Sequence, residues 1–397
     1  MSDWKEYKLG DLVTFQRGHD LPKTEMKGGL YPVAGSNSII GYHNEFTTIS
    51  PGITIGRSGN IGNPQLHKTN FWAHNTVLYV KEFKKVEPVY FYYLLKTLDF
   101  TQLNSGSAVP SLNRNFIHPF VVKVPEDLPT QTAIAEILSS LDDKIELNNK
   151  INQELENLAQ TLFKQWFIDF EFPNENGEPY KSSGGEMVES ELGEIPKGWE
   201  IGTLSEILDV KGGTTPSTKE TKYWNGSINW TSPRDLSNLK SPLLIDTEKK
   251  ITELGLSKIS SGLLPKGTLL LSSRAPIGYL AITTIETAIN QGYIAINGKG
   301  GYSNIYILYW LKSNMNLVVE RANGSTFLEI SKSNFKQINC ILPALNALNS
   351  FTSQSHILFE QLRNNILENQ QLTNLRDTIL PKLISGELEV SQIQTTS

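Results

Sequence analysis

Apolar residues recur every three or four positions over two long stretches of the chain. The first stretch, residues 130–167, contains neither proline nor glycine, and the second repeats the pattern over residues 358–379. Sustained spacing of this kind predicts long helices with a narrow apolar seam, as in a coiled coil. At 1.5 Å per residue the first helix would span about 57 Å. Each helix is the other's most obvious partner, and antiparallel pairing would relate the two halves of the chain by a pseudo-twofold axis.

The expected seam includes asparagines in both helices. A buried asparagine costs stability unless it is hydrogen-bonded, and in return it can fix the register of two helices. The alternative is that these asparagines face solvent where the seam drifts. Pro381 is expected to kink or end the second helix near Leu380. The positions expected to pair the helices are Leu141, Ile145, Asn148, Asn152, Leu155, Leu358, Leu362, Asn365, Asn369 and Leu372.

The remaining sequence has the pattern of two globular blocks built from short strands. Strand-like runs at residues 52–55, 77–80, 267–271 and 294–296 are separated by Gly, Pro and Asn turns. Short amphipathic helices are predicted at residues 88–97 and 304–313. No regular strand–helix alternation is present, so we expect mixed blocks in an α+β fold. Residues 171–197, rich in Glu, Gly, Pro and Ser, are typical of an exposed connector.

The two halves of the chain repeat each other. Residues 152–161 align without a gap on residues 369–378, with six identities in ten positions. Weaker echoes inside the blocks place Arg57 opposite Arg274. Six segments follow: a first block at 1–125, a helix at 126–170, a connector at 171–198, a second block at 199–343, a second helix at 344–390 and a tail at 391–397.

Further echoes place Phe116 opposite Phe335, and Pro125 opposite Pro343. The spacing between matching residues varies inside the blocks, whereas the helices match without a gap. Insertions therefore fall in the blocks, and constant helices carrying variable blocks are themselves a functional hint.

Composition describes a folded protein, and the charge is unevenly distributed. The chain has 397 residues, 39% hydrophobic and 19% charged, with a net charge of −5. Counted along the sequence, residues 1–125 carry +4 and residues 201–343 carry +5, whereas residues 126–200 carry −12. A local basic face can bind phosphates whatever the global sign, although ordinary scatter in charge would look the same.

Cysteine usage and hydropathy bear on the compartment. The only cysteine, Cys340, leaves no disulfide or cysteine-based zinc site and suits a reducing cytoplasm. The beginning of the chain does not have the pattern of a secretory signal. The most apolar window, residues 263–282, is interrupted by prolines and charges, so it predicts buried strands and no membrane span.

A search for catalytic motifs finds none that is complete. There is no P-loop and no Gly-rich loop typical of a methyl-donor site. The fragment Asn63-Pro64-Gln65-Leu66 lacks the second proline and the aromatic residue that an adenine methyltransferase motif needs. The six histidines show no metal-ligand spacing. We therefore expect no catalytic residue, metal or cofactor on this chain.

Loops that mix basic, amide and hydroxyl side chains are the main candidates for function, because these groups pair with base edges and phosphates. Trp224, Trp230 and Trp310 are expected in the core. Arg57 and Arg274 are favoured as DNA contacts because their positions match in the two halves, although an arginine beside a turn glycine is as often structural. The candidates are Arg17, Arg57, Ser58, Asn60, His74, Asn75, Asn113 and Arg114 in the first block, and Lys211, Thr214, Thr215, Ser217, Arg234, Arg274, Asn290, Gln291, Lys332 and Ser333 in the second.

Four phrases, in this order, resemble the specificity subunits of type I restriction-modification systems. They are Leu9-Gly-Asp-Leu12 after Trp4, the segment 191–199, the segment 213–230 and the segment 380–388. Together with the duplication, the resemblance covers essentially the whole chain. The first block lacks the Gly-Gly-Thr-Thr-Pro opening of the second, so the surface that would read DNA is less well defined in the first block.

The resemblance implies two target recognition domains, each reading one half of a split, asymmetric site on double-stranded DNA. The helices would act as a ruler and as the dock for two modification subunits, which bind S-adenosylmethionine and methylate adenine at N6. Two restriction subunits, using ATP and Mg²⁺, would complete a cytoplasmic bacterial defence complex. A second hypothesis is a coiled-coil scaffold whose blocks bind protein, and a third, less favoured, is an independent enzyme.

Overall fold

The computed structural model describes residues 3–26, 28–58, 60–100, 111–324 and 328–391. The chain forms two compact units. Unit 1 comprises Met1–Leu147 and Leu367–Ser397, and unit 2 comprises Asn148–Ile366. Each unit therefore contains one globular block and one part of each long helix.

Unit 1 is built on a four-stranded sheet of order β2-β8-β5-β6 and a three-stranded sheet of order β4-β3-β7. The central strand β5 is buried along its whole length. The elements before the first long helix are β1 (Trp4–Lys8), α1 (Leu9–Leu12), β2 (Val13–Arg17), η1 (Lys23–Glu25), β3 (Tyr31–Ala34), β4 (Ile39–His43), β5 (Gly52–Gly56), β6 (Pro64–His67), β7 (Trp72–Ala73), β8 (Val77–Phe83), α2 (Pro88–Lys96), α3 (Arg114–Ile117) and β9 (Val121–Pro125).

Unit 2 is built on a five-stranded sheet of order β13-β20-β17-β18-β15 and a three-stranded sheet of order β16-β14-β19. Its elements between the long helices are β10 (Met187–Ser190), β11 (Gly193–Pro196), β12 (Glu200–Thr203), α5 (Leu204–Ile207), β13 (Leu208–Gly212), η3 (Thr221–Tyr223), β14 (Trp224–Thr231), α6 (Pro233–Leu236), β15 (Leu243–Leu244), β16 (Lys249–Ile251), α7 (Glu253–Leu256), β17 (Leu269–Ser273), β18 (Ile277–Thr283), β19 (Ala288–Ile289), β20 (Tyr293–Gly298), α8 (Asn304–Ser313), α9 (Met315–Glu320), α10 (Lys332–Lys336) and β21 (Asn339–Leu342).

The two units share one topology, which confirms the internal repeat and the α+β class. In the large sheets, β2, β8, β5 and β6 correspond in order to β13, β20, β17 and β18. In the small sheets, β3 pairs with β7 and β14 pairs with β19, both parallel. The short helices predicted at residues 88–97 and 304–313 are α2 and α8. They begin alike, since Glu87 caps α2 by accepting from the amide of Tyr90, and Ser303 caps α8 by accepting from that of Tyr306.

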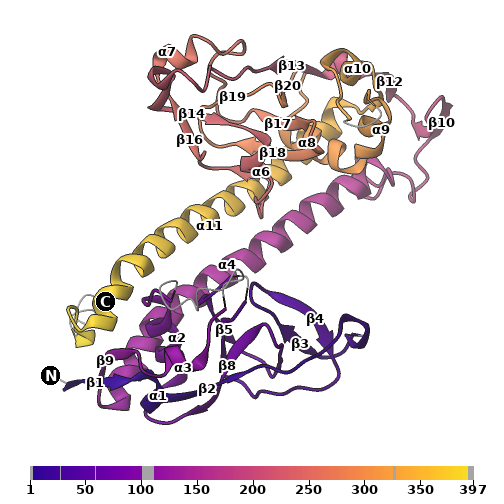
Figure 1. The fold of residues 1–397 in the computed structure, drawn as a ribbon. Helices are drawn as coiled ribbons and strands as arrows, with labels where there is room; N and C mark the ends of the chain where they lie inside the picture. Colours follow the sequence, from indigo (N-terminus) through magenta and orange to yellow (C-terminus); the bar gives the residue numbers. More distant parts are fainter. Residues whose placement is uncertain (1–2, 27, 59, 101–110, 325–327, 392–397) are drawn as a thin grey trace. The chain divides into compact units, whose positions relative to one another are not determined.

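The two long helices are α4 (Leu128–Phe167) and α11 (Leu345–Ser385), both continuous in Figure 1. Within unit 2 the ring of Phe163 on α4 packs 5.9 Å from that of Phe351 on α11. Within unit 1 Lys144 on α4 forms an ion pair with Glu368 on α11, at 3.3 Å. Asn152 also meets Asn365 in unit 2, and Asp142 meets Arg376 in unit 1. In each unit the contacts move forward along α11 as they move back along α4, so the helices are antiparallel, as expected.

All of the expected seam positions are at least partly removed from solvent, and four of the ten are buried. Leu362, Asn148, Asn152 and Asn365 are buried, which rules out the solvent-facing alternative for these three asparagines. The remaining predicted positions, at the half-buried edge of the seam, are Leu141, Ile145, Leu155, Leu358, Asn369 and Leu372.

Asn152 and Asn365 meet inside unit 2, where the Asn365 side-chain amide donates to the Asn152 side-chain oxygen at 2.9 Å. Asn152→Ala should cost about 1–3 kcal/mol, because it leaves the buried Asn365 amide without this partner. Replacing both asparagines with leucine should be close to neutral. Urea unfolding of the two variants tests this coupling, and equal losses in the single and double variants would contradict it.

One sequence expectation is wrong in part, and another is incomplete. Pro381 was expected to kink or end the second helix, and the helix does not end near Leu380, because Pro381 lies inside α11. Its missing amide falls in the last turns, where burial of Leu383 and Ile384 in the unit 1 core holds the helix. The segment 171–197 is mostly exposed, as expected of a connector, but it is also anchored, since Phe172 is buried and stacks 5.0 Å from Trp199. The hairpin β10–β11 gives the segment further structure.

His67 makes unit 1 sensitive to acid. Its ring is stacked 4.0 Å from Phe71, and burial lowers its pKa to about 4 from the ordinary 6.5. The unfolded chain therefore takes up this proton at higher pH than the folded chain. The stability that neutral His67 contributes is complete above pH 6.5. The free energy of unfolding should fall, by up to about 1.4 kcal/mol per pH unit, as the pH drops towards 4. Thermal unfolding across this window should be flatter for His67→Gln, and an unchanged slope would contradict the assignment.

Candidate nucleic-acid interface

The loops at one end of each large sheet carry most of the candidate residues. In unit 1 this end comprises the end of β2, the end of β5 and the turn before β8. In unit 2 it comprises the end of β13, the end of β17 and the turn before β20. The turns match closely, because the His74 amide donates to the Ala34 carbonyl and the Asn290 amide donates to the Thr231 carbonyl, both at 3.1 Å.

The same hydrogen-bond register corrects one sequence match. The backbone amide of Arg57 donates to the Thr76 carbonyl at 2.9 Å, and that of Ser273 donates to the Gly292 carbonyl at 2.8 Å. Thr76 and Gly292 hold the same position in the two turns, because each lies two residues after the amide that bonds to the small sheet. Arg57 is therefore equivalent to Ser273, and Arg274 to Ser58. Since side chains alternate across a strand, a shift of one residue turns a side chain to the other face. The expectation that Arg57 and Arg274 occupy equivalent positions is wrong.

The sequence match between Phe116 and Phe335 is also displaced by one residue. Asn113 caps α3, and Ser331 caps α10. Counting four residues from each cap reaches Ile117 and Phe335, which are both buried, whereas Phe116 is 51% exposed. Ile117 is therefore the equivalent of Phe335, because the helix buries only one of its faces.

In unit 1 a cluster of polar side chains gathers around one carboxylate. The Arg17 guanidinium donates to Asp20 at 2.9 Å, and the Asn75 side-chain amide donates to the same carboxylate. These bonds, from Asn75 foremost and then Arg17, hold the pKa of Asp20 below its ordinary value. Arg57 donates to the Asn75 backbone carbonyl at 3.4 Å, so the structure brings Arg17, Arg57 and Asn75 together.

The other unit 1 candidates lie around this cluster. Ser58 forms an isolated bridge with Ser111. The His74 ring and the Thr76 hydroxyl are 3.0 Å apart. Asn60 and Arg114 are exposed, whereas the Asn113 side chain is occupied in capping α3.

In unit 2 the corresponding end presents a similar set of groups. The Thr215 hydroxyl donates to the Gln291 side-chain oxygen at 2.7 Å. Arg274 forms an ion pair with Glu329 at 3.3 Å, and its side chain remains 38% exposed. Lys332 reaches over the end of β13, because a methyl group on Gly212 would lie 3.1 Å from its ammonium nitrogen.

Three further unit 2 candidates serve the local fold. Thr214 donates its hydroxyl to the Lys258 carbonyl at 2.8 Å. Asn290 accepts the Gly292 amide at 2.9 Å. The hydroxyls of Ser333 and Ser331 are 2.9 Å apart. Lys211 and Ser217 are exposed.

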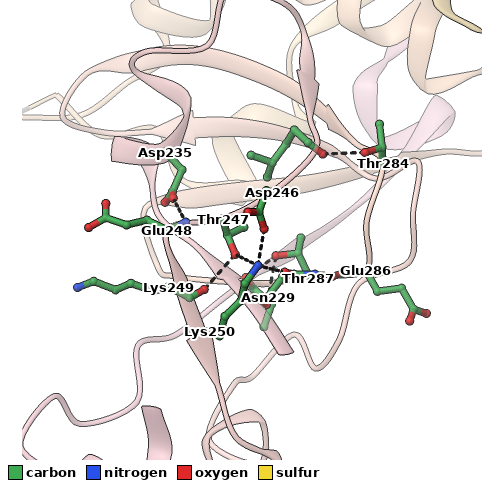
Figure 2. Close-up of polar contacts among 12 residues, drawn as sticks. Asn229, Asp235, Asp246, Thr247, Glu248, Lys249, Lys250, Thr284, Glu286 and Thr287 are labelled. Carbon is green, nitrogen blue, oxygen red and sulfur yellow. Dashed lines mark hydrogen bonds and ion pairs between the residues drawn. The ribbon is translucent and has the colours of Figure 1, made fainter. Parts of the chain in front are cut away.

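Arg234 stands on a short helix, α6, that a polar network holds beside the same turn. Asp235 accepts the amides of Ser232 and Glu248, at 2.8 and 3.0 Å, and Figure 2 shows this carboxylate next to Glu248. Figure 2 also shows Lys250 with Asp246, an ion pair that braces the neighbouring strand β16. The Arg234 side chain is 82% exposed and lies 4.0 Å from Glu248, so it is held outward.

Sequence reasoning missed residues that the structure places beside the candidate residues. Asp20 and Glu329 are acidic, and a search for basic and amide groups passes over them although they orient Arg17 and Arg274. Asn37 is exposed three residues after Ala34, as Arg234 is three residues after Thr231. The loop composition around Asn37 could have found it, but its match to Arg234 depends on strand register.

Other expectations concern the core and metals. Trp230 and Trp310 are buried, as expected, and Trp224 is half-buried against Trp230 with ring centroids 5.1 Å apart. Across the described ranges, no group of three or more His, Cys, Asp or Glu side chains could hold a metal ion. Within those same ranges, no helix has both the length and the apolar character needed to cross a bilayer.

The fold defines an internally repeated protein in which two related α+β units share a pair of long antiparallel helices. The chain belongs to the family described as type I restriction modification DNA specificity domain, whose model matches residues 1–157 and 196–383. It is accordingly a specificity subunit, which is the non-catalytic component of such a system.

Individual relatives agree with the family assignment. The HindI specificity subunit of Haemophilus influenzae is 26% identical over 470 aligned positions, covering 98% of this chain and 100% of the relative. The MjaIX specificity subunit of Methanocaldococcus jannaschii is 38% identical over 161 residues, but the match spans 40% of this chain and 37% of the relative. A crystal structure of the type I S subunit from M. genitalium shares the fold, with a TM-score of 0.64, 17% identity and 96% of each chain covered.

Proposed function

We propose that each unit reads one half of a bipartite, asymmetric sequence in double-stranded DNA. The observation that carries this proposal is the repetition of one loop cluster at the same end of both large sheets. Each cluster combines a cation with an amide side chain, Arg17 with Asn75 in unit 1 and Arg274 with Gln291 in unit 2. Cations position a protein on phosphates, and amides read base edges. Because the clusters differ in sequence, the two half-sites would differ too.

We also propose that the long helices set the gap between the half-sites and bind the partner subunits. Helix α4 carries three lysines against six acidic residues, and residues 168–200 after it carry two against nine, so this part of the chain disfavours contact with phosphates and favours a protein partner. Both helices expose large apolar residues, including Leu158 at 54% and Ile357 at 69%. The partners would be two modification subunits, which hold S-adenosylmethionine and methylate adenine N6, and two restriction subunits, which use ATP and Mg²⁺. The complex would act in the cytoplasm in bacterial defence.

A domain transplant tests this function. Residues 199–343 would be replaced by the corresponding block of a relative, with the modification partner present. If the blocks read DNA, one half of the methylated motif should change while the other half and the gap persist. If the chain is a scaffold whose blocks bind protein, the motif should be unchanged. Gel-shift assays of the complex should also show tighter, salt-sensitive binding to duplexes that carry the complete motif.

A further inference from the structure

Asn75 and Gln291 occupy the same position at the tip of equivalent turns. Each follows directly on the residue, His74 or Asn290, whose amide bonds to the small sheet at 3.1 Å. Each also precedes an inner strand of its large sheet, β8 or β20. Two different sequences therefore place a carboxamide at one point of the interface.

The side chains of the residues just before these amides, His74 and Asn290, lie in contact with other groups of the turn. The His74 ring and the hydroxyl two residues later are 3.0 Å apart. The Asn290 side-chain oxygen accepts the backbone amide two residues later at 2.9 Å. Position 74 or 290 therefore shapes the turn, and position 75 or 291 is left at its tip with a partly or fully exposed side chain.

A second side chain fixes each carboxamide. Asp20 accepts a hydrogen bond from the Asn75 nitrogen Nδ2, and the Thr215 hydroxyl donates to the Gln291 oxygen Oε1 at 2.7 Å. Asp20 and Thr215 are themselves equivalent, since each lies two residues after a glycine, Gly18 or Gly213, that packs against the neighbouring turn. The same pairwise contact thus exists in both units with different chemistry.

These contacts leave a reading edge on each amide. A carboxamide has two N–H groups and two oxygen lone pairs. Asp20 uses one N–H of Asn75, and Thr215 uses one lone pair of Gln291. These contacts therefore leave each amide at least one N–H and one oxygen lone pair for a base edge. In the major groove this pair matches adenine, which offers an N6 amine and an N7 acceptor, whereas guanine offers two acceptors.

We propose that Asn75 and Gln291 each read an adenine, and that Asp20 and Thr215 are the positioning residues that orient them. The inference rests on the proposed function and assigns the chemistry of one base in each half-site. The adenine lies in the half-site of unit 1 for Asn75 and in that of unit 2 for Gln291. Its complementary thymine occupies the same base pair.

Methylation-aware sequencing tests the proposal with the chain and its modification partner expressed in a host that lacks other adenine methylation. Asn75→Ala should relax one A·T position in one half of the motif, and Gln291→Ala one A·T position in the other half. Discrimination at that position should fall roughly 10- to 100-fold, the range for one lost bidentate pair. Asp20→Ala and Thr215→Val should relax the same two positions to a smaller extent. Gln354→Ala, an exposed amide on α11, is the control and should leave the motif intact.

Each outcome decides the question. Relaxation at a G·C position, at different positions for Asn75 and Asp20, or at none would overturn the proposal. A wild-type chain with no two-part motif would instead remove the proposed function on which it rests. If a variant abolishes all methylation, duplexes with 7-deazaadenine at single positions are bound to the wild-type complex. Weaker binding should appear at one adenine in each half-site, and unchanged binding at every adenine would also overturn the proposal.

Discussion

Replacing Gly213 with alanine is expected to disable unit 2 as a reader and to leave unit 1 intact. The new methyl group would lie 1.9 Å from the Ile289 carbonyl oxygen. This oxygen belongs to the backbone beside the turn that presents Gln291, so the clash cannot be relieved by rotating a side chain. Overpacking of this kind costs on the order of 3 kcal/mol. We expect a lower thermal midpoint and loss of recognition at one half-site.

Gly18 and Gly212 provide matched comparisons for this variant. A methyl group on Gly18 would lie 2.0 Å from the His74 carbonyl oxygen, so Gly18→Ala should have the corresponding effect on unit 1. At Gly212 the nearest atom is the flexible end of Lys332, at 3.1 Å, and the stability loss should stay below about 1 kcal/mol. Equal thermal midpoints for the Gly213 and Gly212 variants would show that the close approach of strand and turn does not matter.

Reversing the charge of Arg274 is the second change with a large expected effect. Arg274→Glu would place a carboxylate beside Glu329 and, in the proposed complex, beside phosphates. Both repulsions act at the interface of unit 2, so binding to the cognate duplex should weaken by at least about tenfold. The dependence of binding on salt should become shallower, because a cation near phosphates is lost.

Lys299 supplies the control for Arg274. It follows β20 at the opposite end of the same sheet and forms a similar ion pair, 3.4 Å from Asp209, with its side chain 42% exposed. Lys299→Glu makes the same change in net charge away from the interface, and cognate binding should change less than twofold at physiological salt. If both variants weaken binding equally, the effect is one of net charge, and the assigned face is wrong.

The sequence was most informative where a pattern is local and repeated. The helices α4 and α11 follow from spacing of three and four, and α2 and α8 were predicted within about one residue. The duplication is legible because residues 152–161 and 369–378 match without a gap. Each of these signals depends on neighbours along the chain.

The features that could not be predicted from the sequence depend on the register between strands that are distant along the chain. The match of Arg57 to Arg274 fails by one residue because loops of different length separate the strands, and only the bonds to the turn define the alignment. Asp20 was missed because its role comes from Arg17 and Asn75, and Asn75 is distant in sequence. Pairwise contacts of this kind leave no periodic signal.

The most direct test of the central claim is methylation-aware sequencing of a host genome with and without this gene, its modification partner present in both. The account predicts a methyladenine motif in two parts, separated by a fixed gap, that disappears when the gene is deleted. The partner must first be shown to bind S-adenosylmethionine in both strains. With that established, an unchanged methylation pattern would contradict the account and favour a scaffold whose two units bind protein.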